Sequence, residues 1–270
     1  MKPSNNRTYV IYRVGSIGGS KIRNRKPSTL LGAAKHNLRE IHLELGPGSC
    51  IDSSKSNQNL VLVGSNCAQG IVTQMRNRML EAGIDSTKLR HDYVQAAEIL
   101  ISLSNDLGEE TLAFFNYCVE WLRDWFGNEN LVSAIVHFDE SQPHLHALVA
   151  PVVGRKANGN FLINQPNLKR QKIAFEKAVS SKFGVQMPPE KPSRMIQMAA
   201  ANCVIQHLIK INSPILRDPA HNTILNSIRK DPFQFIADYG LSFDPEVKAR
   251  SMKTMVQIFT SRGKGKKSRT

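Results

Sequence analysis

The sequence predicts an α+β fold, in which a central antiparallel sheet is flanked by helices and followed by a small helical C-terminal region. Apolar, β-branched segments of strand length are interspersed with segments of helical periodicity. Two of the strands are joined by a short turn, which predicts a hairpin at the centre of the sheet. The hydrophobic content of 41% is sufficient for a packed core and argues against a disordered chain.

Each element is predicted from its local pattern. Alternation and β-formers indicate strands, and apolar residues at helical spacing indicate helices that end near glycines such as Gly83 and Gly127. The segment 107–126 is amphipathic, with Leu112, Phe115 and Val119 on one side. In chain order we expect a strand (9–14), helices (29–42 and 68–82), a strand (94–103), a helix (107–126), two strands (131–138 and 144–153) and a helix (166–183).

The chain is expected to contain two regions. Residues 1–190 form the predicted α+β domain, and the prolines at 188, 189 and 192 mark its end. Residues 191–270 are predicted to form a basic helical region with a flexible basic tail. No apolar run is long enough for a transmembrane helix, and the N-terminal segment is too interrupted for a signal peptide, so we expect a cytoplasmic protein.

Positive charge is concentrated at both ends of the sequence. The net charge is +14, no acidic residue precedes Glu40, and none follows Glu246. Segments that carry only positive charges attract polyanions, and binding releases the counterions of the polyanion. This pattern favours nucleic acid as the partner. A solvated surface or a disordered basic tail would have the same composition.

The most informative pattern is the ten-residue segment from His137 to His146. His144 and His146 are two residues apart, which places both rings on one face of a strand. His137 lies on the preceding strand, and a hairpin would bring it beside them. Three neutral imidazoles that converge on one face can hold a divalent metal with open coordination positions. Glu140, in the connecting turn, is a candidate fourth ligand, a partner of a ligand, or a base.

This segment, H-x-D-E-x-x-P-H-x-H, resembles the plasmid mobilisation and recombination (Mob/Pre, or MobV-type) relaxases of the HUH endonuclease superfamily. A second motif of that family, G-x-x-K-H-N-x-R, is matched by residues 32–39. A third, weaker similarity ends in Asn-Tyr in the family, whereas this chain has Asn59 followed by Leu60. Arg90-His91-Asp92 is similar to an R-x-D motif that precedes a strand. The resemblance covers about residues 7–190.

The resemblance implies a relaxase that nicks one DNA strand at a plasmid transfer origin and later rejoins it, using Mn²⁺ or Mg²⁺. It implies that His36 is the nucleophile, that Arg39 steadies a phosphate oxygen, and that a 5′ phosphate remains on the enzyme. Three tyrosines are alternative nucleophiles: Tyr9, Tyr12 and Tyr93. From the local sequence alone, His36 is interpreted as an ordinary surface residue of a helix.

Several residues are candidates for DNA contact. The basic loop from Lys21 to Lys26 suits phosphate binding, although an ordinary solvated loop would have the same composition. Its assignment to phosphate binding therefore rests on nucleic acid being the partner. The candidates are Lys21, Arg23, Arg25, Lys26, Lys35, Asn59 and Arg90.

Two further functions fit the same residues. One is a rolling-circle replication initiator or a transposase with HUH chemistry, and the other is a DNA-binding protein that has lost catalysis, for which the change to Leu60 is an argument. The resemblance also implies coupling or accessory mobilisation proteins as partners. It also implies a homodimer, since members of that family end in a coiled coil that serves dimerisation, but the heptad pattern of a coiled coil is missing here, which argues against this homodimer.

Overall fold

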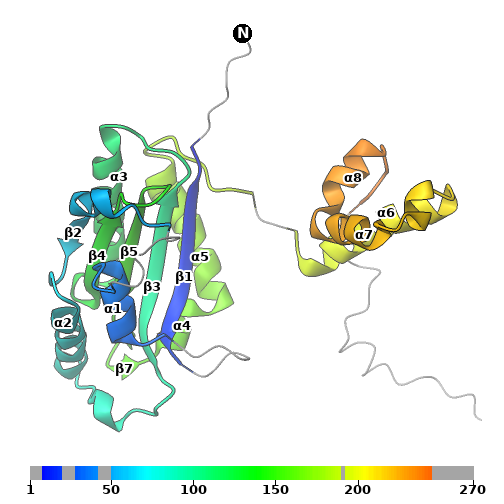
Figure 1. Ribbon diagram of the computed structural model, residues 1–270. Coiled ribbons are helices and arrows are strands. Elements are labelled where there is room, and N and C mark those ends of the chain that lie inside the picture. The colour runs from blue at the N-terminus through cyan, green and yellow to red at the C-terminus, as the bar shows by residue number, and fades with distance from the viewer. Residues whose placement is uncertain (1–7, 20–27, 42–49, 190–191, 245–270) are drawn as a thin grey trace, which may run out of the picture. The chain divides into compact units, whose positions relative to one another are not determined.

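The computed structural model describes residues 8–19, 28–41, 50–189 and 192–244. The chain divides into two compact units, Met1–Pro188 and Pro189–Thr270. The first contains a five-stranded sheet with helices on both faces (Figure 1). The predicted α+β class, with its antiparallel sheet and C-terminal helices, is therefore confirmed.

The sheet has the strand order β1-β3-β5-β4-β2, and every neighbouring pair is antiparallel. The predicted hairpin is the pair β4 and β5, in which His137 lies opposite His144. Because β5 is the middle strand, this hairpin lies at the centre of the sheet. The strands are β1 (Val10–Gly18), β2 (Leu60–Val63), β3 (Val94–Leu103), β4 (Leu131–His137) and β5 (His144–Val149).

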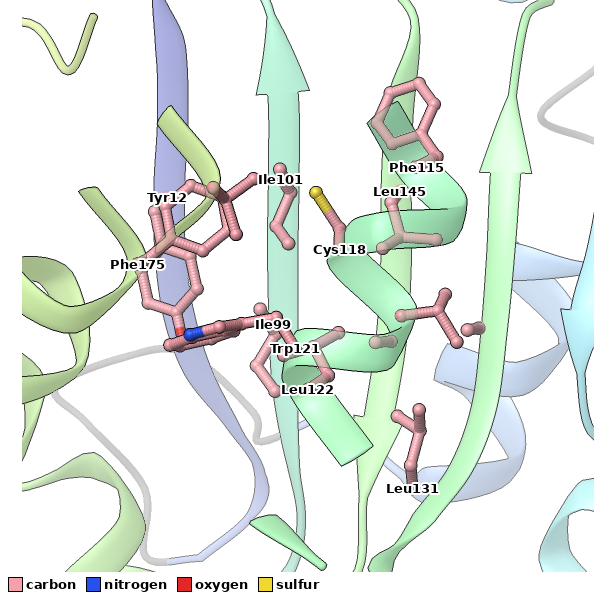
Figure 2. Packing of buried hydrophobic residues seen from close by; sticks show 14 of the residues in the cluster. Tyr12, Ile99, Ile101, Phe115, Cys118, Trp121, Leu122, Leu131, Leu145 and Phe175 are labelled. Carbon is pink, nitrogen blue, oxygen red and sulfur yellow. The ribbon is translucent and has the colours of Figure 1, made fainter. Parts of the chain in front are cut away.

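The two faces of the sheet are covered by different helices. Helices α1 (Leu30–Asn37) and α2 (Ala68–Glu81) pack on one face, in a cluster that includes Ile135 and Leu148. Helix α3 (Glu110–Phe126) covers the other face. Figure 2 shows Phe115, Cys118, Trp121 and Leu122 of α3 packed against Ile99, Ile101 and Leu145 of the sheet. The remaining elements of this unit are β6 (Val152–Val153), β7 (Lys156–Ala157), α4 (Gly159–Ile163) and α5 (Gln165–Phe175).

Some predicted boundaries differ from those observed. The helix predicted at 29–42 ends at Asn37, and Arg39 adopts a left-handed φ of 58° that no helix can continue through. Thr29 caps this helix by accepting a hydrogen bond from the Gly32 amide. The helix predicted at 166–183 gives way after Phe175 to a wider turn over Glu176–Ser180. Strand β2 was not predicted.

The described residues of the second unit form three α-helices, α6 (Arg194–Lys210), α7 (His221–Lys230) and α8 (Pro232–Asp238), and a short 3-10 helix at Pro214–Arg217. Ala201, Val204, Leu208 and Ile228 form its small core. The predicted basic tail, 245–270, lies outside the described residues. Within the described residues, no helix is both long and apolar enough to cross a membrane.

Candidate active site

Three histidines meet at one end of the β4–β5 hairpin. The ring centroids of His137, His144 and His146 lie 5.0 to 5.1 Å from one another. One nitrogen from each ring lies within 4.8 Å of a nitrogen of the other two. The alternation of β5 sends His144 and His146 to the face that α1 covers, as their spacing predicts.

The second nitrogen of each ring faces an oxygen. His137 Nε2 lies 2.7 Å from the carbonyl oxygen of Asn37, and His144 Nδ1 lies 2.8 Å from that of Gln142. His146 Nδ1 lies 3.1 Å from Glu98 Oε1. These outer nitrogens therefore carry the ring protons, and the inner nitrogens present lone pairs to one another. The inner nitrogens of His137 and His144 are 3.2 Å apart. Converging lone pairs with hydrogen-bonded outer nitrogens are the donor set that suits a divalent cation.

Burial keeps the rings of His137 and His144 in the neutral form. Burial and the neighbouring His146 and Arg39 together lower the pKa of His137 to about 2. Burial also lowers the pKa of His144. Burial opposes ionisation of Glu98, but its hydrogen bond with His146 and the charge of that ring hold the pKa of the carboxyl below its ordinary value. The site thus combines two neutral rings with a carboxylate that orients the third.

A buried carboxylate fixes the segment around the histidines. Asp139 is fully buried and accepts hydrogen bonds from Arg39 Nε (3.0 Å) and Nη2 (2.8 Å). It also accepts from the Ser56 hydroxyl and the Asn59 amide, both at 2.7 Å. Burial disfavours the charged form, but Arg39 and the other donors hold the pKa of Asp139 well below its ordinary value. One carboxylate therefore links the end of α1, the start of β2 and the end of β4.

This network gives Asn59 a structural role beside its predicted contact with DNA. Its amide nitrogen donates to Asp139, and its amide oxygen accepts from the Phe138 backbone at 2.8 Å. The side chain therefore joins the start of β2 to the end of β4, and its contact with DNA stays a prediction. Leu60, at the position of the family's tyrosine, is partly exposed at the start of β2.

The guanidinium of Arg39 also forms most of its hydrogen bonds with other residues of the protein. Besides its two bonds to Asp139, it donates to Glu140 Oε1 at 2.7 Å. Its Nη1 is buried without an acceptor among the described residues. Glu140 Oε1 lies 3.8 Å from His144 Nε2, beside the histidine cluster.

Helix α1 brings His36 to the cluster. The ring centroid of His36 lies 5.6 Å from that of His146, and His36 is half-buried. The next residue, Asn37, supplies the carbonyl that orients His137. Lys35 precedes them and is exposed. One turn of helix thus carries both the candidate nucleophile and the carbonyl that orients one of the candidate metal ligands.

Other predicted residues lie elsewhere. Arg90 is exposed and forms a bidentate ion pair with Asp92, just before the start of β3. His144 and His146 pair with residues near the end of that strand, so the structure separates Arg90 from the cluster by most of the length of β3. The basic residues Lys21, Arg23, Arg25 and Lys26 lie outside the described residues.

The three tyrosines named as alternative nucleophiles lie at different places relative to the histidine cluster. Tyr12 faces the opposite side of the sheet, is buried, and donates to Gln171 Oε1 at 3.1 Å. Tyr93 precedes β3, at the end of the sheet away from the histidines. Tyr9 precedes β1 and pairs through its backbone with Ser104, so it lies at the same end as His144.

Sequence reasoning missed Glu98 and Asp139. Glu98 is the only charged residue within the strand Val94–Leu103, and a lone acid in an otherwise buried strand is a signal that could have found it. Asp139 is the acidic residue of the H-x-D-E segment, so the family motif includes it, but an acidic residue in a turn is ordinary and does not by itself indicate a buried network.

The family comparison agrees with these features. A family model described as plasmid recombination enzyme (Mob_Pre) matches residues 20–187. The chain belongs to this family. A Mob_Pre relative, the plasmid recombination enzyme type 3 of Staphylococcus aureus, is 32% identical over 192 residues, which is 66% of this chain and 43% of the relative. A plasmid recombination enzyme of Streptococcus agalactiae is 27% identical over 155 residues, 56% of this chain and 31% of the relative. The chain therefore spans less than half the length of these curated relatives.

Solved Mob_Pre structures share the fold. The MobM relaxase domain, solved with bound Mn and plasmid pMV158 oriT DNA, has a TM-score of 0.56 and 25% sequence identity. This match covers 68% of the present chain and 90% of the MobM domain.

Proposed function

We propose that this Mob_Pre protein is a metal-dependent relaxase that nicks one strand at a plasmid transfer origin, holds the cut end covalently and rejoins it, for plasmid mobilisation and recombination. The observation that carries the proposal is the placement of His36 beside His146, one of three imidazoles whose inner nitrogens are left for a cation. The bound Mn and oriT DNA of the MobM domain support it. The proposed partner is therefore plasmid DNA, single-stranded or supercoiled, in the cytoplasm.

His137, His144 and His146 would hold the cation, with Mn²⁺ or Mg²⁺ as the candidates. Bound there, a divalent cation would polarise the scissile phosphate and neutralise its developing charge. Glu98 fixes the ring of His146, and the Asn37 and Gln142 carbonyls fix the other two. Glu140 is near enough to complete the ligand set or to accept a proton.

His36 is the proposed nucleophile. The lone pair of an imidazole nitrogen forms a bond to phosphorus, the bond from phosphorus to the 3′ oxygen breaks, and that oxygen leaves with the electron pair. The imidazole, now positively charged, releases the proton of its other nitrogen to solvent, and the 3′ oxygen takes up a proton from solvent. The product is a free 3′-OH and a 5′ phosphate on His36. Because the phosphorus–nitrogen bond conserves the energy of the cleaved ester, the reverse reaction reseals the strand without ATP. Arg39 acts through Asp139 as a positioning residue, and its buried Nη1 is the donor left for a phosphate oxygen.

The decisive experiment is a covalent-adduct assay. The protein is incubated with Mn²⁺ and a labelled oligonucleotide carrying the transfer origin of its plasmid, and the products are denatured before electrophoresis. We expect an acid-labile adduct that EDTA and His36→Ala both abolish. His91→Ala is the matched control, because His91 is an exposed histidine far from the cluster along β3.

The outcomes separate the competing functions. DNA binding without an adduct would leave a DNA-binding protein that has lost catalysis. An adduct that survives His36→Ala and is lost in Tyr9→Phe would move the nucleophile to Tyr9, which lies at the histidine end of β1. An adduct on a replication origin in place of a transfer origin would favour a rolling-circle initiator or a transposase. Accessory mobilisation proteins and a homodimer stay predictions.

A further inference from the structure

A row of residues crosses the sheet from the histidines to the edge strand. His146 of β5 lies opposite Leu100 of β3, and Leu100 lies opposite Arg13 of β1. Side chains of directly opposite residues project to the same face, so Arg13 and His146 share one face. Two strand spacings of about 4.8 Å put Arg13 about 10 Å from His146 along this row. Figure 1 shows β1 and β3 side by side at this edge.

This part of the face is open within the described residues. Arg13 and Gly15 are exposed, and a Cβ added to Gly15 would meet nothing within 4 Å. Helix α1 packs over Ile17, nearer the other end of β1. Tyr12, whose side chain points the opposite way, is buried. Within the described residues, β1 is thus covered on one face, and on the face that carries the histidines it is open at Arg13 and Gly15.

The charge of Arg13 is not neutralised by the described part of the protein. The acid placed to pair with it is Glu98, which lies on the same face opposite Gly15. Glu98 is engaged by His146 at 3.1 Å, and Arg13 forms no ion pair with it. A guanidinium that has no acidic partner among the described residues, beside a candidate cation site, is suited to an anion that extends from that site.

We propose that Arg13 binds a backbone phosphate of the DNA strand next to the scissile phosphate, so that the strand leaves the histidine cluster across β3 towards β1. This inference rests on the proposed function, because it takes the scissile phosphate to lie at the histidines. The planar fork of arginine can grip two phosphate oxygens at once. Leu100, half-buried between Arg13 and His146, forms an apolar floor for the intervening sugar or base.

The test measures binding of the full chain to a fluorescein-labelled, mixed-sequence single-stranded DNA, by anisotropy over a range of salt concentrations with Mn²⁺ present. We expect Arg13→Ala to weaken binding about tenfold at low salt, the effect of one hydrogen-bonded charge pair. The slope of log affinity against log salt should fall in magnitude by about 0.7, the value for one phosphate contact on a single strand. Arg13→Lys should keep the slope while losing part of the affinity, because it keeps the charge and loses the fork.

Arg155→Ala is the matched control. Arg155 is an exposed arginine on the β6–β7 turn, beyond the end of β5 that lies away from the histidines, and its loss should leave both quantities unchanged. The inference is overturned if Arg13→Ala behaves as Arg155→Ala does, or if Arg13→Ala and Arg13→Lys lose affinity equally with no change of slope. Failure of the proposed function would appear separately, as a wild-type protein that binds this DNA but forms no adduct on origin DNA.

Discussion

The two faces of the five-stranded sheet are made by alternate residues of the same strands, and they differ sharply in chemistry. On the face under α3, Ile99, Ile101 and Leu145 belong to a continuous apolar core (Figure 2). On the other face, the neighbouring positions include Glu98 and His146, which are bonded to each other. A strand of period two can therefore stabilise the fold with one set of side chains and hold a reactive site with the other.

This contrast predicts that the two faces can be damaged separately. Substitutions on the histidine face should remove chemistry and leave the fold, and substitutions on the α3 face should do the reverse. Leu145 stands between His144 and His146 in sequence, so the comparison can be made within three consecutive residues.

The largest effect is expected for His146→Ala. Removing one of three imidazoles should abolish the Mn²⁺-dependent adduct, because substitutions of residues that merely support metal ligands already cost about 10–100-fold. The metal-free variant should unfold in urea at nearly the wild-type concentration, since His146 is only partly buried. An adduct retained at wild-type yield would remove His146 from the site.

Leu145→Ala should show the opposite behaviour. Leu145 is fully buried in the core under α3, and such truncations lower the free energy of unfolding by about 2–5 kcal/mol. Adduct yield per folded molecule should stay within about twofold. Loss of the adduct in a protein that circular dichroism shows to be folded would mean that the two faces are coupled.

The histidine face should also make the metal-free protein sensitive to acid. The folded state holds the pKa of His137 near 2, so below pH 6.5 the unfolded chain takes up the proton first and stability falls as the pH falls. Between pH 7 and pH 5 the loss should be about 2 kcal/mol for this group. Urea unfolding in EDTA at the two pH values measures it. His137→Gln should flatten the dependence, and an equally steep dependence in that variant would assign it to other groups.

The smallest effect is expected for Tyr12→Phe on the α3 face. Its hydroxyl donates to Gln171, and losing that bond should cost about 1 kcal/mol. Adduct formation should be unchanged, because the hydroxyl points away from the histidines. A variant that folds but forms no adduct would reinstate Tyr12 as a candidate nucleophile.

The sequence predicts the part of the site that depends on local geometry. His144 and His146 share a face because of strand alternation, and a short turn must return the chain beside His137. The apolar segments likewise predict most elements, and the strand at 94–103 has the predicted bounds. These features need only the period of a strand and the length of a turn.

The rest depends on contacts between distant segments. The pairing of β3 with β5, which brings Glu98 to His146, is a property of the strand order and not of either strand alone. The structural role of Asn59 could not be predicted, because a loop amide that links two segments looks the same in sequence as one that does not. Its partner Asp139 lies 80 residues further along the chain.

The Asp139 network has a consequence for biosynthesis. Arg39 and Asn59 leave the ribosome long before the carboxylate that secures them, and contacts across such sequence separations form only after the intervening chain has been made. A nascent chain that ends before Asp139 also lacks His144 and His146. The proposed nucleophile and the proposed metal site would therefore mature together, and an incomplete translation product that has His36 without His144 and His146 should be harmless to the DNA around it.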